Sequence, residues 1–429
     1  VRQELHKLPF QHKSNDLYEF YQSPDIATAA EAYRLQALTQ LKDTIYSVDF
    51  VRFMERLTGI ALNHHTVDMS AHRYSQGGYL LCHDDDIRQS KEGRRIAYII
   101  YLVDEDWSAK DGGALDLFAK DDHNQPQEIV HSVVPQWNTF AFFEVGATSF
   151  HQVAEVHRST GRLSISGWLH GPIPEANQRP SYELVPQPVI CQENLMLAEY
   201  IMPEFLGDQA IGNINKVFLE QSSIELQNFL QPKLYADLVH ALTQRPLAGA
   251  VTGPPNVMHY TRYFVPDVAT DTSTVAQLQR LFTSDAFSQL LSQYTNLEGL
   301  KRCKAEWRTF APSHYTLLHD LAIETDGLDV LFTLPLPLTQ PLSTDTTLSS
   351  TNRSSPVSTT EPAATTWDEA WQGGMHYVAD KETLLTLWPK PNTLSIVFRD
   401  QGTMRFVKYL NHQAKSTRTE FAATFYEDP

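Results

Sequence analysis

The stretch Tyr79-Leu-Leu-Cys-His83-Asp84-Asp85 places an imidazole and a carboxylate two residues apart at the end of an apolar run. In a β-strand, residues i and i+2 point to the same face, so His83 and Asp85 are expected to project together while Asp84 points away. One histidine and one carboxylate make a partial metal site that needs a third ligand from elsewhere. His-x-Asp alone is a weak signal, since such pairs are common on protein surfaces.

A second histidine, His151, follows several predicted strands later in Ser149-Phe-His151-Gln-Val. Two histidines and one carboxylate on one face form the facial triad of non-haem Fe(II) oxygenases, which leaves coordination positions open for a cosubstrate and O₂. We predict that His83, Asp85 and His151 together bind Fe(II).

The segment Arg162-Leu-Ser164-Ile-Ser166 alternates polar and apolar side chains, as expected for a strand with one polar face. A guanidinium inside a β-barrel needs an anion, and arginine binds carboxylates through two parallel hydrogen bonds. The distal carboxylate of 2-oxoglutarate would satisfy Arg162, with Ser164 adding a hydroxyl donor. The alternative is a surface arginine paired with a nearby glutamate, and the presence of the triad favours the cosubstrate.

The region between Met69 and about Gly171 consists of short apolar runs separated by turn residues. Such repeated short strands favour an antiparallel sandwich or barrel. Apolar residues with helical spacing precede this region. Within it, Trp137 and Trp168 are interpreted as core aromatic residues. The fold class is therefore α+β, with helices predicted over 24–47 and 48–57 and strands over 96–103, 114–118, 129–133, 139–145 and 163–168.

The second half repeats the order of helices and strands seen in the first. Tyr315-Thr-Leu-Leu-His319-Asp-Leu321 aligns with Tyr79–Asp85, and Gln372-Gly-Gly-Met aligns with Asp111-Gly-Gly-Ala. We predict two tandem domains of one fold, the second a degenerate copy of the first. Chance similarity between short apolar strands is the alternative.

Two substitutions predict that the second domain is not catalytic. Leu321 stands at the position of Asp85, and Arg405 aligns with His151, so one remaining imidazole, His319, cannot hold Fe(II). The predicted organisation is a catalytic domain over 1–178, a linker and connecting helix over 179–215, and a non-catalytic domain over 216–429. Residues 341–366 are rich in Ser, Thr and Pro and are predicted to be a disordered insertion.

Composition narrows the class of partner. The chain has 34 Lys and Arg against 51 Asp and Glu, a net charge of −17. Phosphate binding needs clustered basic residues, so direct nucleic-acid binding is not expected, whereas a basic partner is favoured. The longest apolar run, 96–103, is far shorter than a membrane span. Three cysteines do not make a disulfide framework, which favours the cytoplasm and nucleus.

Four segments resemble the eukaryotic ribosomal prolyl hydroxylases, a family of Fe(II)/2-oxoglutarate-dependent oxygenases. They are 80–85 (LLCHDD), 93–103 (GRRIAYIIYLV), 149–156 (SFHQVAEV) and 162–168 (RLSISGW). The resemblance implies two double-stranded β-helix domains of jelly-roll, cupin-like architecture, of which only the first is active. It also implies hydroxylation of a proline in a small-subunit ribosomal protein, with decarboxylation of 2-oxoglutarate to succinate and an effect on translation accuracy or termination.

The resemblance also assigns individual residues. It puts iron on His83, Asp85 and His151, and the far carboxylate of 2-oxoglutarate on Arg162. It implies that Tyr101 hydrogen-bonds to the same carboxylate, that Tyr74 contacts the cosubstrate, and that ascorbate supports the reaction. The segment between His83 and Gly93 is longer than is usual in the family, so a longer loop is expected at the active-site mouth.

Two other interpretations stay open at this point. The same chemistry could act on another protein residue or on a nucleic-acid base. Alternatively, both domains could be non-enzymatic docking modules for translation or transcription-control complexes, and the second domain could bind such partners even in an enzyme. The intact triad with Arg162 argues against a pure scaffold.

Overall fold

The computed structural model describes residues 1–87, 91–174, 189–190, 195–244, 249–263, 270–318, 326–338 and 366–427. The chain divides into two compact units, Val1–Tyr182 with Gly253–Met258, and Glu183–Thr252 with His259–Pro429. The predicted linker over 179–215 lies partly outside the described residues. So do His319, Leu321 and nearly all of the predicted insertion over 341–366.

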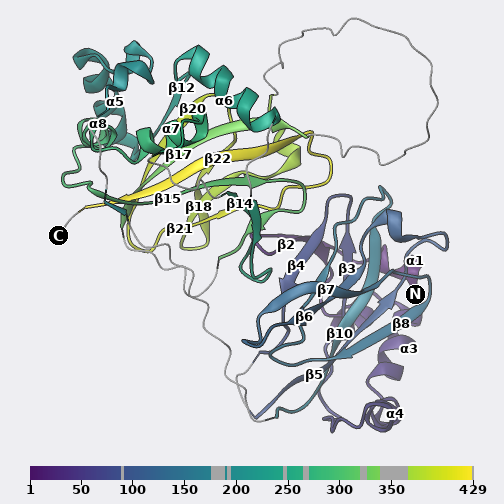
Figure 1. Cartoon of the computed structure of the whole chain (residues 1–429). Coiled ribbons are helices and arrows are strands. Elements are labelled where there is room, and N and C mark those ends of the chain that lie inside the picture. Colours follow the sequence, from purple (N-terminus) through teal and green to yellow (C-terminus); the bar gives the residue numbers. More distant parts are fainter. Residues whose placement is uncertain are drawn as a thin grey trace, which may run out of the picture. The chain divides into compact units, whose positions relative to one another are not determined.

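The first unit is built on one antiparallel sheet with short helices packed against it (Figure 1). The helices are α1 (Arg2–Leu5), α2 (Ile26–Ala32), α3 (Gln36–Ile45) and α4 (Val48–Thr58), with a 3₁₀ turn η1 (Ala109–Asp111). The strands are β1 (Gln11–Ser14), β2 (Tyr18–Gln22), β3 (Ser70–Tyr74), β4 (Tyr79–His83), β5 (Glu92–Tyr101), β6 (Leu115–Lys120), β7 (Pro126–Val133), β8 (Thr139–Glu144), β9 (His151–Val153) and β10 (Arg162–Pro172). Their order in the sheet is β7-β6-β9-β4-β2-β3-β10-β5-β8, with β1 beside β2.

The sheet curls until its two ends face each other. Ile99 and Tyr101 of β5 pack against Leu115 of β6, and partly buried residues of β7 and β8 join this cluster. Apolar residues of α2, α3 and α4 cover the other face of β3, β5 and β10. A curled antiparallel sheet covered by helices on one side is a jelly-roll type of fold, and its concave face is left for a site.

Helix ends in this unit follow local chemistry. The helix predicted over 24–47 is two helices, because Arg34 adopts a left-handed φ of 53° between α2 and α3. The side chain of Ser47 accepts a hydrogen bond from the Phe50 backbone N–H at the start of α4, and Gly59 ends that helix at φ 73°. The five predicted strands correspond to β5 to β8 and β10, whereas β1 and β2 were not predicted.

The second unit has a larger sheet and a separate three-stranded sheet. Its helices are α5 (Asp208–Gln221), α6 (Pro232–Gln244), α7 (Thr274–Phe282) and α8 (Asp285–Thr295), with 3₁₀ turns η2 (Leu197–Glu199), η3 (Pro203–Phe205) and η4 (Glu369–Trp371). Its strands are β11 (Val189–Ile190), β12 (Ser223–Gln227), β13 (Gly249–Thr252), β14 (Met258–Tyr263), β15 (Arg302–Phe310), β16 (Tyr315–Thr316), β17 (Gly327–Pro337), β18 (Met375–Ala379), β19 (Glu382–Leu387), β20 (Thr393–Arg399), β21 (Met404–Val407) and β22 (Ser416–Tyr426).

The larger sheet of the second unit runs β12-β20-β17-β22-β15-β14-β13, and the smaller one runs β19-β18-β21. Helices α5 to α8 gather over one side of the larger sheet in Figure 1, and their apolar residues form the main core with β15, β17, β20 and β22. Strand β17 is buried at every position before its last. In the part of the chain that the structure describes, no helix is long and apolar enough to cross a membrane.

A glycine in β10 provides a test of how closely the sheet is packed. A Cβ on Gly167 would lie 1.7 Å from the carbonyl oxygen of Asp68, a backbone atom that cannot move without shifting the neighbouring chain. We expect Gly167→Ala to lower the free energy of unfolding by about 3 kcal/mol. Chemical denaturation measures this loss.

Gly146→Ala is the matched control, because a Cβ there would have no atom of the described residues within 4 Å. It should change the free energy of unfolding by less than about 1 kcal/mol. Equal stability of the Gly167 variant and the parent would contradict the packing described for β10.

Candidate active site

Two histidines meet across a strand pair on the first unit's curled sheet. His83 is the last residue of β4, and the register of β4 with β9 places it directly opposite His151. Directly opposed residues of antiparallel strands have their side chains on the same face, and here the ring centroids are 4.3 Å apart. Strand pairing thus brings together two residues that are far apart in the sequence.

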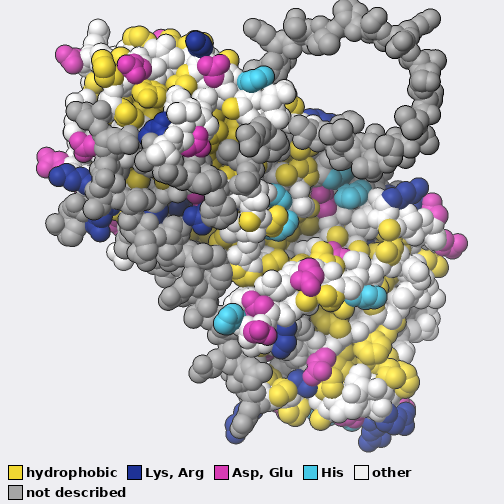
Figure 2. Space-filling model, viewed as in Figure 1, with side chains coloured by type: hydrophobic (Ala, Val, Ile, Leu, Met, Phe, Trp, Pro, Cys, Tyr) yellow, Lys and Arg dark blue, Asp and Glu magenta, His cyan; other side chains and the backbone are white. Residues whose placement is uncertain are grey.

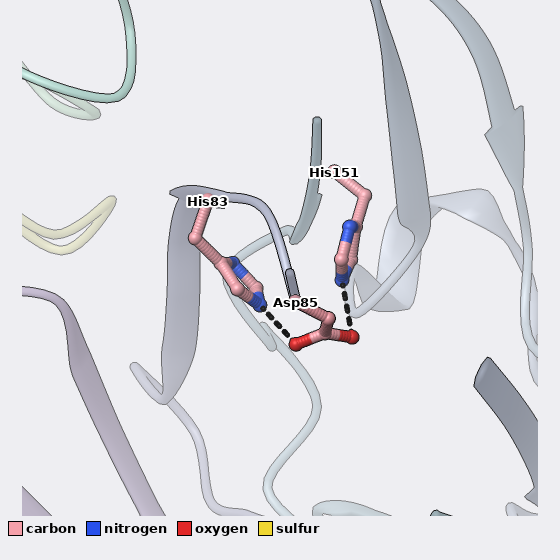
Figure 3. Close-up of side chains that lie close together, drawn as sticks. All are labelled: His83, Asp85 and His151. Carbon is pink, nitrogen blue, oxygen red and sulfur yellow. Dashed lines mark ion pairs between the residues drawn. The ribbon is translucent and has the colours of Figure 1, made fainter. Parts of the chain in front are cut away.

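Asp85 completes the cluster from the loop that follows β4 (Figure 3). Its Oδ1 lies 3.5 Å from Nε2 of His83, and its Oδ2 lies 3.5 Å from Nε2 of His151. One ligand atom from each of the three residues lies within 4.8 Å of the others. Asp85 is outside the strand, so the predicted i, i+2 strand geometry does not apply to it, yet the side chains converge.

Backbone carbonyls orient both imidazole rings. Nδ1 of His83 lies 2.8 Å from the carbonyl oxygen of Leu81, and Nδ1 of His151 lies 2.9 Å from that of Ser149. With a metal ion bound, a proton on each Nδ1 would satisfy these acceptors and leave both Nε2 lone pairs for the metal. The Nε2 atoms of both rings face Asp85, so all three side chains present a ligand atom to one point.

The charges in the cluster shift its titration. Burial alone would raise the pKa of Asp85, but hydrogen bonding and attraction from the two histidines outweigh it and hold this pKa far below its usual range. Burial would also lower the pKa of His83, but its interactions with Asp85 raise it overall. A carboxylate that stays ionised beside two imidazoles is the donor set that a divalent transition metal requires.

Trp168 of β10 fixes the carboxylate of Asp85. Its indole Nε1 donates a 2.9 Å hydrogen bond to Oδ2 of Asp85, and the guanidinium of Arg94 stacks 3.5 Å from the centroid of the indole ring. The sequence interpretation had assigned Trp168 to the core. The sequence does contain a signal for its place in the site. Every second residue of a strand points to the same face, so Trp168 shares a face with Arg162, Ser164 and Ser166.

Arg162 at the start of β10 is buried, with 1% of its surface exposed. Its Nη1 donates to Oγ of Ser164 at 3.2 Å, but Nε and Nη2 have no hydrogen-bond partner among the described residues. A buried guanidinium with two unsatisfied donors is costly unless an anion binds there. The geometry suits a carboxylate ligand.

Aromatic residues surround this guanidinium. Its central carbon lies 5.1 Å from the ring centroid of Tyr74 and 5.0 Å from that of Tyr101. The Tyr101 hydroxyl is also buried, and it has no hydrogen-bond partner in the described part of the chain. Gly113, at φ 69°, lets the backbone approach, since a Cβ there would lie 2.7 Å from Cδ of Arg162. Arg162, Ser164, Tyr74 and Tyr101 therefore lie together as the sequence predicted, and their individual roles stay predictions.

Comparison with known proteins identifies the family. Residues 69–170 match the family model described as 2OG-Fe(II) oxygenase superfamily, and residues 192–428 match the one described as oxoglutarate and iron-dependent oxygenase degradation C-term. A prolyl 3-hydroxylase OGFOD1 from Xenopus laevis is 34% identical over all of this chain and 84% of its own length. The Mus musculus protein of that name is 30% identical over 100% of this chain and 86% of its own length.

The chain belongs to the OGFOD1 prolyl 3-hydroxylase family. It is an Fe(II)- and 2-oxoglutarate-dependent oxygenase, and it uses O₂ as its second cosubstrate. Among solved structures, a Trichoplax adhaerens prolyl hydroxylase complex is 11% identical and covers 51% of this chain and 90% of its own, with a TM-score of 0.34. That score is too low to add to the assignment.

The indole of Trp168 generates a prediction about the metal site. Trp168→Phe keeps an aromatic ring beside Arg94 but removes the hydrogen bond to Asp85, so the carboxylate loses its fixed orientation. We expect the affinity for Mn(II), measured by calorimetry in the absence of O₂ and substrate, to fall about 10- to 100-fold.

Trp137→Phe serves as the control, since Trp137 is 39% exposed and forms no described contact with the three-residue cluster. Its Mn(II) affinity should equal that of the parent. Unchanged affinity in the Trp168 variant would show that the indole does not orient Asp85.

Proposed function

We propose that this oxygenase hydroxylates a prolyl residue of a basic small-subunit ribosomal protein and thereby affects translation accuracy or termination. The observation that carries the proposal is the triad of His83, Asp85 and His151 in the same curled sheet as the buried Arg162, whose Nε and Nη2 have no hydrogen-bond partner among the described residues. Support for proline comes from relatives named prolyl 3-hydroxylase, and one from Ostreococcus tauri is named prolyl 3,4-dihydroxylase. The ribosomal substrate rests on the sequence resemblance.

In this proposal each site residue has one task. His83, Asp85 and His151 hold Fe(II) from one side, and Trp168 keeps Asp85 from turning. Arg162 binds the far carboxylate of 2-oxoglutarate, with the Tyr101 hydroxyl and Ser164 donating to the same group and Tyr74 packing against it. Ascorbate would keep the iron reduced between turnovers.

The bound iron supplies the oxidising chemistry, in which 2-oxoglutarate and O₂ yield succinate and CO₂ and one oxygen atom enters a prolyl C–H bond. The protein's own contribution is orientation and protection from water. The far carboxylate is fixed at a buried guanidinium, so the opposite end of 2-oxoglutarate is directed toward the three ligands. Phe143 packs against the His151 ring, with centroids 4.6 Å apart, and limits water beside that ligand.

The charge of the chain agrees with a basic substrate. Its net charge is −17, and Figure 2 shows acidic side chains interspersed with basic ones on the face displayed. A mixed, acidic surface attracts a basic peptide and repels a phosphate backbone. We propose that the enzyme works in the cytoplasm and nucleus, where the thiols of Cys82 and Cys303 would stay reduced.

We also propose that the second unit is a degenerate, non-catalytic jelly-roll copy of the first. The order β8-β5-β10-β3-β2-β1 in the first sheet corresponds to β20-β17-β22-β15-β14-β13 in the second, and β7-β6-β9 corresponds to β19-β18-β21. A match of strand order over nine strands supports duplication better than chance. The proposed domain boundaries are those of the sequence, 1–178 and 216–429.

Matching loop contacts support the same correspondence. Trp107 Nε1 donates to the Gly112 carbonyl, and Trp367 Nε1 donates to the Gln372 carbonyl. Both acceptor residues have positive φ, 71° for Gly112 and 61° for Gln372. These contacts align Gly112 with Gln372, which shifts the sequence alignment of the two Gly-Gly motifs by one residue.

If the proposed correspondence holds, Arg405 stands in the second unit at the position of His151 in the first. His151 lies opposite Leu117, with Val153 opposite Leu115, and Arg405 lies opposite Tyr377, with Val407 opposite Met375. Nη1 of Arg405 forms an ion pair with Oδ1 of Asp329 at 2.5 Å. A cation at this position repels a metal ion, so we propose that the second unit supports the first or binds a translation or transcription-control partner.

Product analysis tests the proposed function. With Fe(II), 2-oxoglutarate and ascorbate, we expect peptides that cover the small-subunit ribosomal proteins to include one that gains 16 Da on proline, with one succinate per hydroxyl. Asp85→Ala should lower the rate to below about 1% because a metal ligand is lost. Asp84→Asn, which keeps the side-chain oxygen that accepts from the Asp86 N–H, is the matched control and should hydroxylate like the parent.

Each contrary result has its own meaning. Hydroxylation by Asp85→Ala at the parent rate would refute the proposal that Asp85 holds the iron. Succinate release without a modified ribosomal peptide would refute the substrate but leave the oxygenase chemistry. No succinate with any peptide would favour a docking scaffold.

A further inference from the structure

The second unit contains a buried arginine at the position that corresponds to Arg162. In the first unit, Arg162 lies opposite Tyr74 and Ser164 opposite His72, across β10 and β3. In the second unit, Arg418 lies opposite Phe310 and Glu420 opposite Arg308, across β22 and β15. The inference drawn from this rests on the proposed duplication.

Two further contacts give the same correspondence. Ser164 lies opposite Tyr101 on β5, and Glu420 lies opposite Thr333 on β17, the strand that corresponds to β5. Gly113 lies against the side chain of Arg162, and Nη1 of Arg418 donates a 3.1 Å hydrogen bond to the carbonyl of Gly373, the residue that corresponds to Gly113. Arg418 therefore corresponds to Arg162, and Glu420 to Ser164.

The surroundings of the two arginines differ in the anion that is present. Nε and Nη2 of Arg162 have no hydrogen-bond partner among the described residues, whereas Nε of Arg418 donates to Oε2 of Glu420 at 2.7 Å. Nη2 of Arg418 lies 2.6 Å from the same oxygen as an ion pair, at an angle that makes no hydrogen bond. The other oxygen of Glu420 accepts a 2.7 Å hydrogen bond from Nε of Arg308. Arg418 and Glu420 are fully buried, so a carboxylate held by two guanidiniums is enclosed in the unit.

The charge state of this group agrees with the geometry. Burial would raise the pKa of Glu420, but Arg418 and Arg308 outweigh it and lower this pKa below the usual value. The side chain is therefore ionised at neutral pH and neutralises the guanidiniums around it.

We propose that Glu420 occupies, within the second unit, the carboxylate position that 2-oxoglutarate fills in the first, so that this unit is closed to dicarboxylates and carries its own internal ligand. A serine at the corresponding position of the first unit, Ser164, leaves room for an external carboxylate. In this proposal, one residue supplies the carboxylate that neutralises the retained arginine.

This proposal predicts chemical rescue. Glu420→Ala leaves buried guanidiniums without their anion and opens a space where the carboxylate was, and breaking a buried ion pair in this way is strongly destabilising. We expect the midpoint of thermal unfolding of the second unit to fall by about 10 °C. Sodium formate at about 0.1 M should restore a large part of this loss by binding the folded state, whereas sodium chloride should not.

The full chain is used, with Mn(II) and 2-oxoglutarate present at saturation so that the first unit's Arg162 is occupied throughout. Glu306→Ala is the matched control, because Glu306 also contacts Arg308, at 3.3 Å, but its side chain is 15% exposed and lies outside the enclosed position. For the parent, the midpoint of thermal unfolding in formate should equal that in chloride. The same should hold for the Glu306 variant. Glu420→Gln should be destabilised without rescue, because the amide fills the space but lacks the charge.

Failure of formate to stabilise Glu420→Ala relative to chloride would overturn the proposal, as would a Glu420→Gln protein as stable as the parent. If Glu420→Ala does not fold alone, its refolding yield in formate and in chloride gives the same comparison. The measurement involves no protein substrate. Rescue together with an absence of peptide hydroxylation would therefore retain the internal ligand and reject only the proposed substrate.

Discussion

The pairing of β4 with β9 is the constraint on which the rest of the site depends. It sets His83 opposite His151, and only this register brings two imidazoles to the face that Asp85 approaches from the following loop. A shift by one residue would turn one ring to the other face and leave no metal site. The curled sheet, its helical cover and the buried strands β5 and β10 hold this register in place.

The two units differ in what neutralises a buried arginine of the sheet. In the first unit the guanidinium of Arg162 lacks an anion within the described chain, so the fold retains a place for a ligand. In the second unit the corresponding arginine, on the proposed alignment, is neutralised by Glu420. On this proposal, one strand order supports a binding site in the first unit and a closed core in the second, because a buried charge must be paired by a ligand or by the protein.

Much of the site was predictable from local patterns. Alternation along β10 predicted that Arg162 and Ser164 share a face, and the triad residues followed from their types and spacing. Register and loop geometry were not predictable. Alternation along β10 indicates the face on which Trp168 lies, but its hydrogen bond to Asp85 joins segments 83 residues apart and has no local signal. The break between α2 and α3, where Arg34 adopts a left-handed conformation, also lacks a glycine to mark it.

Calorimetric titration of 2-oxoglutarate into the Mn(II)-loaded chain tests the central claim most directly. The account predicts that the parent binds one 2-oxoglutarate per chain, also in the absence of protein substrate. It predicts that Arg162→Ala binds none. Two sites per chain would mean that the second unit is open to dicarboxylates. Binding that survives the loss of Arg162 would mean that the buried guanidinium of the first unit is not the cosubstrate's partner.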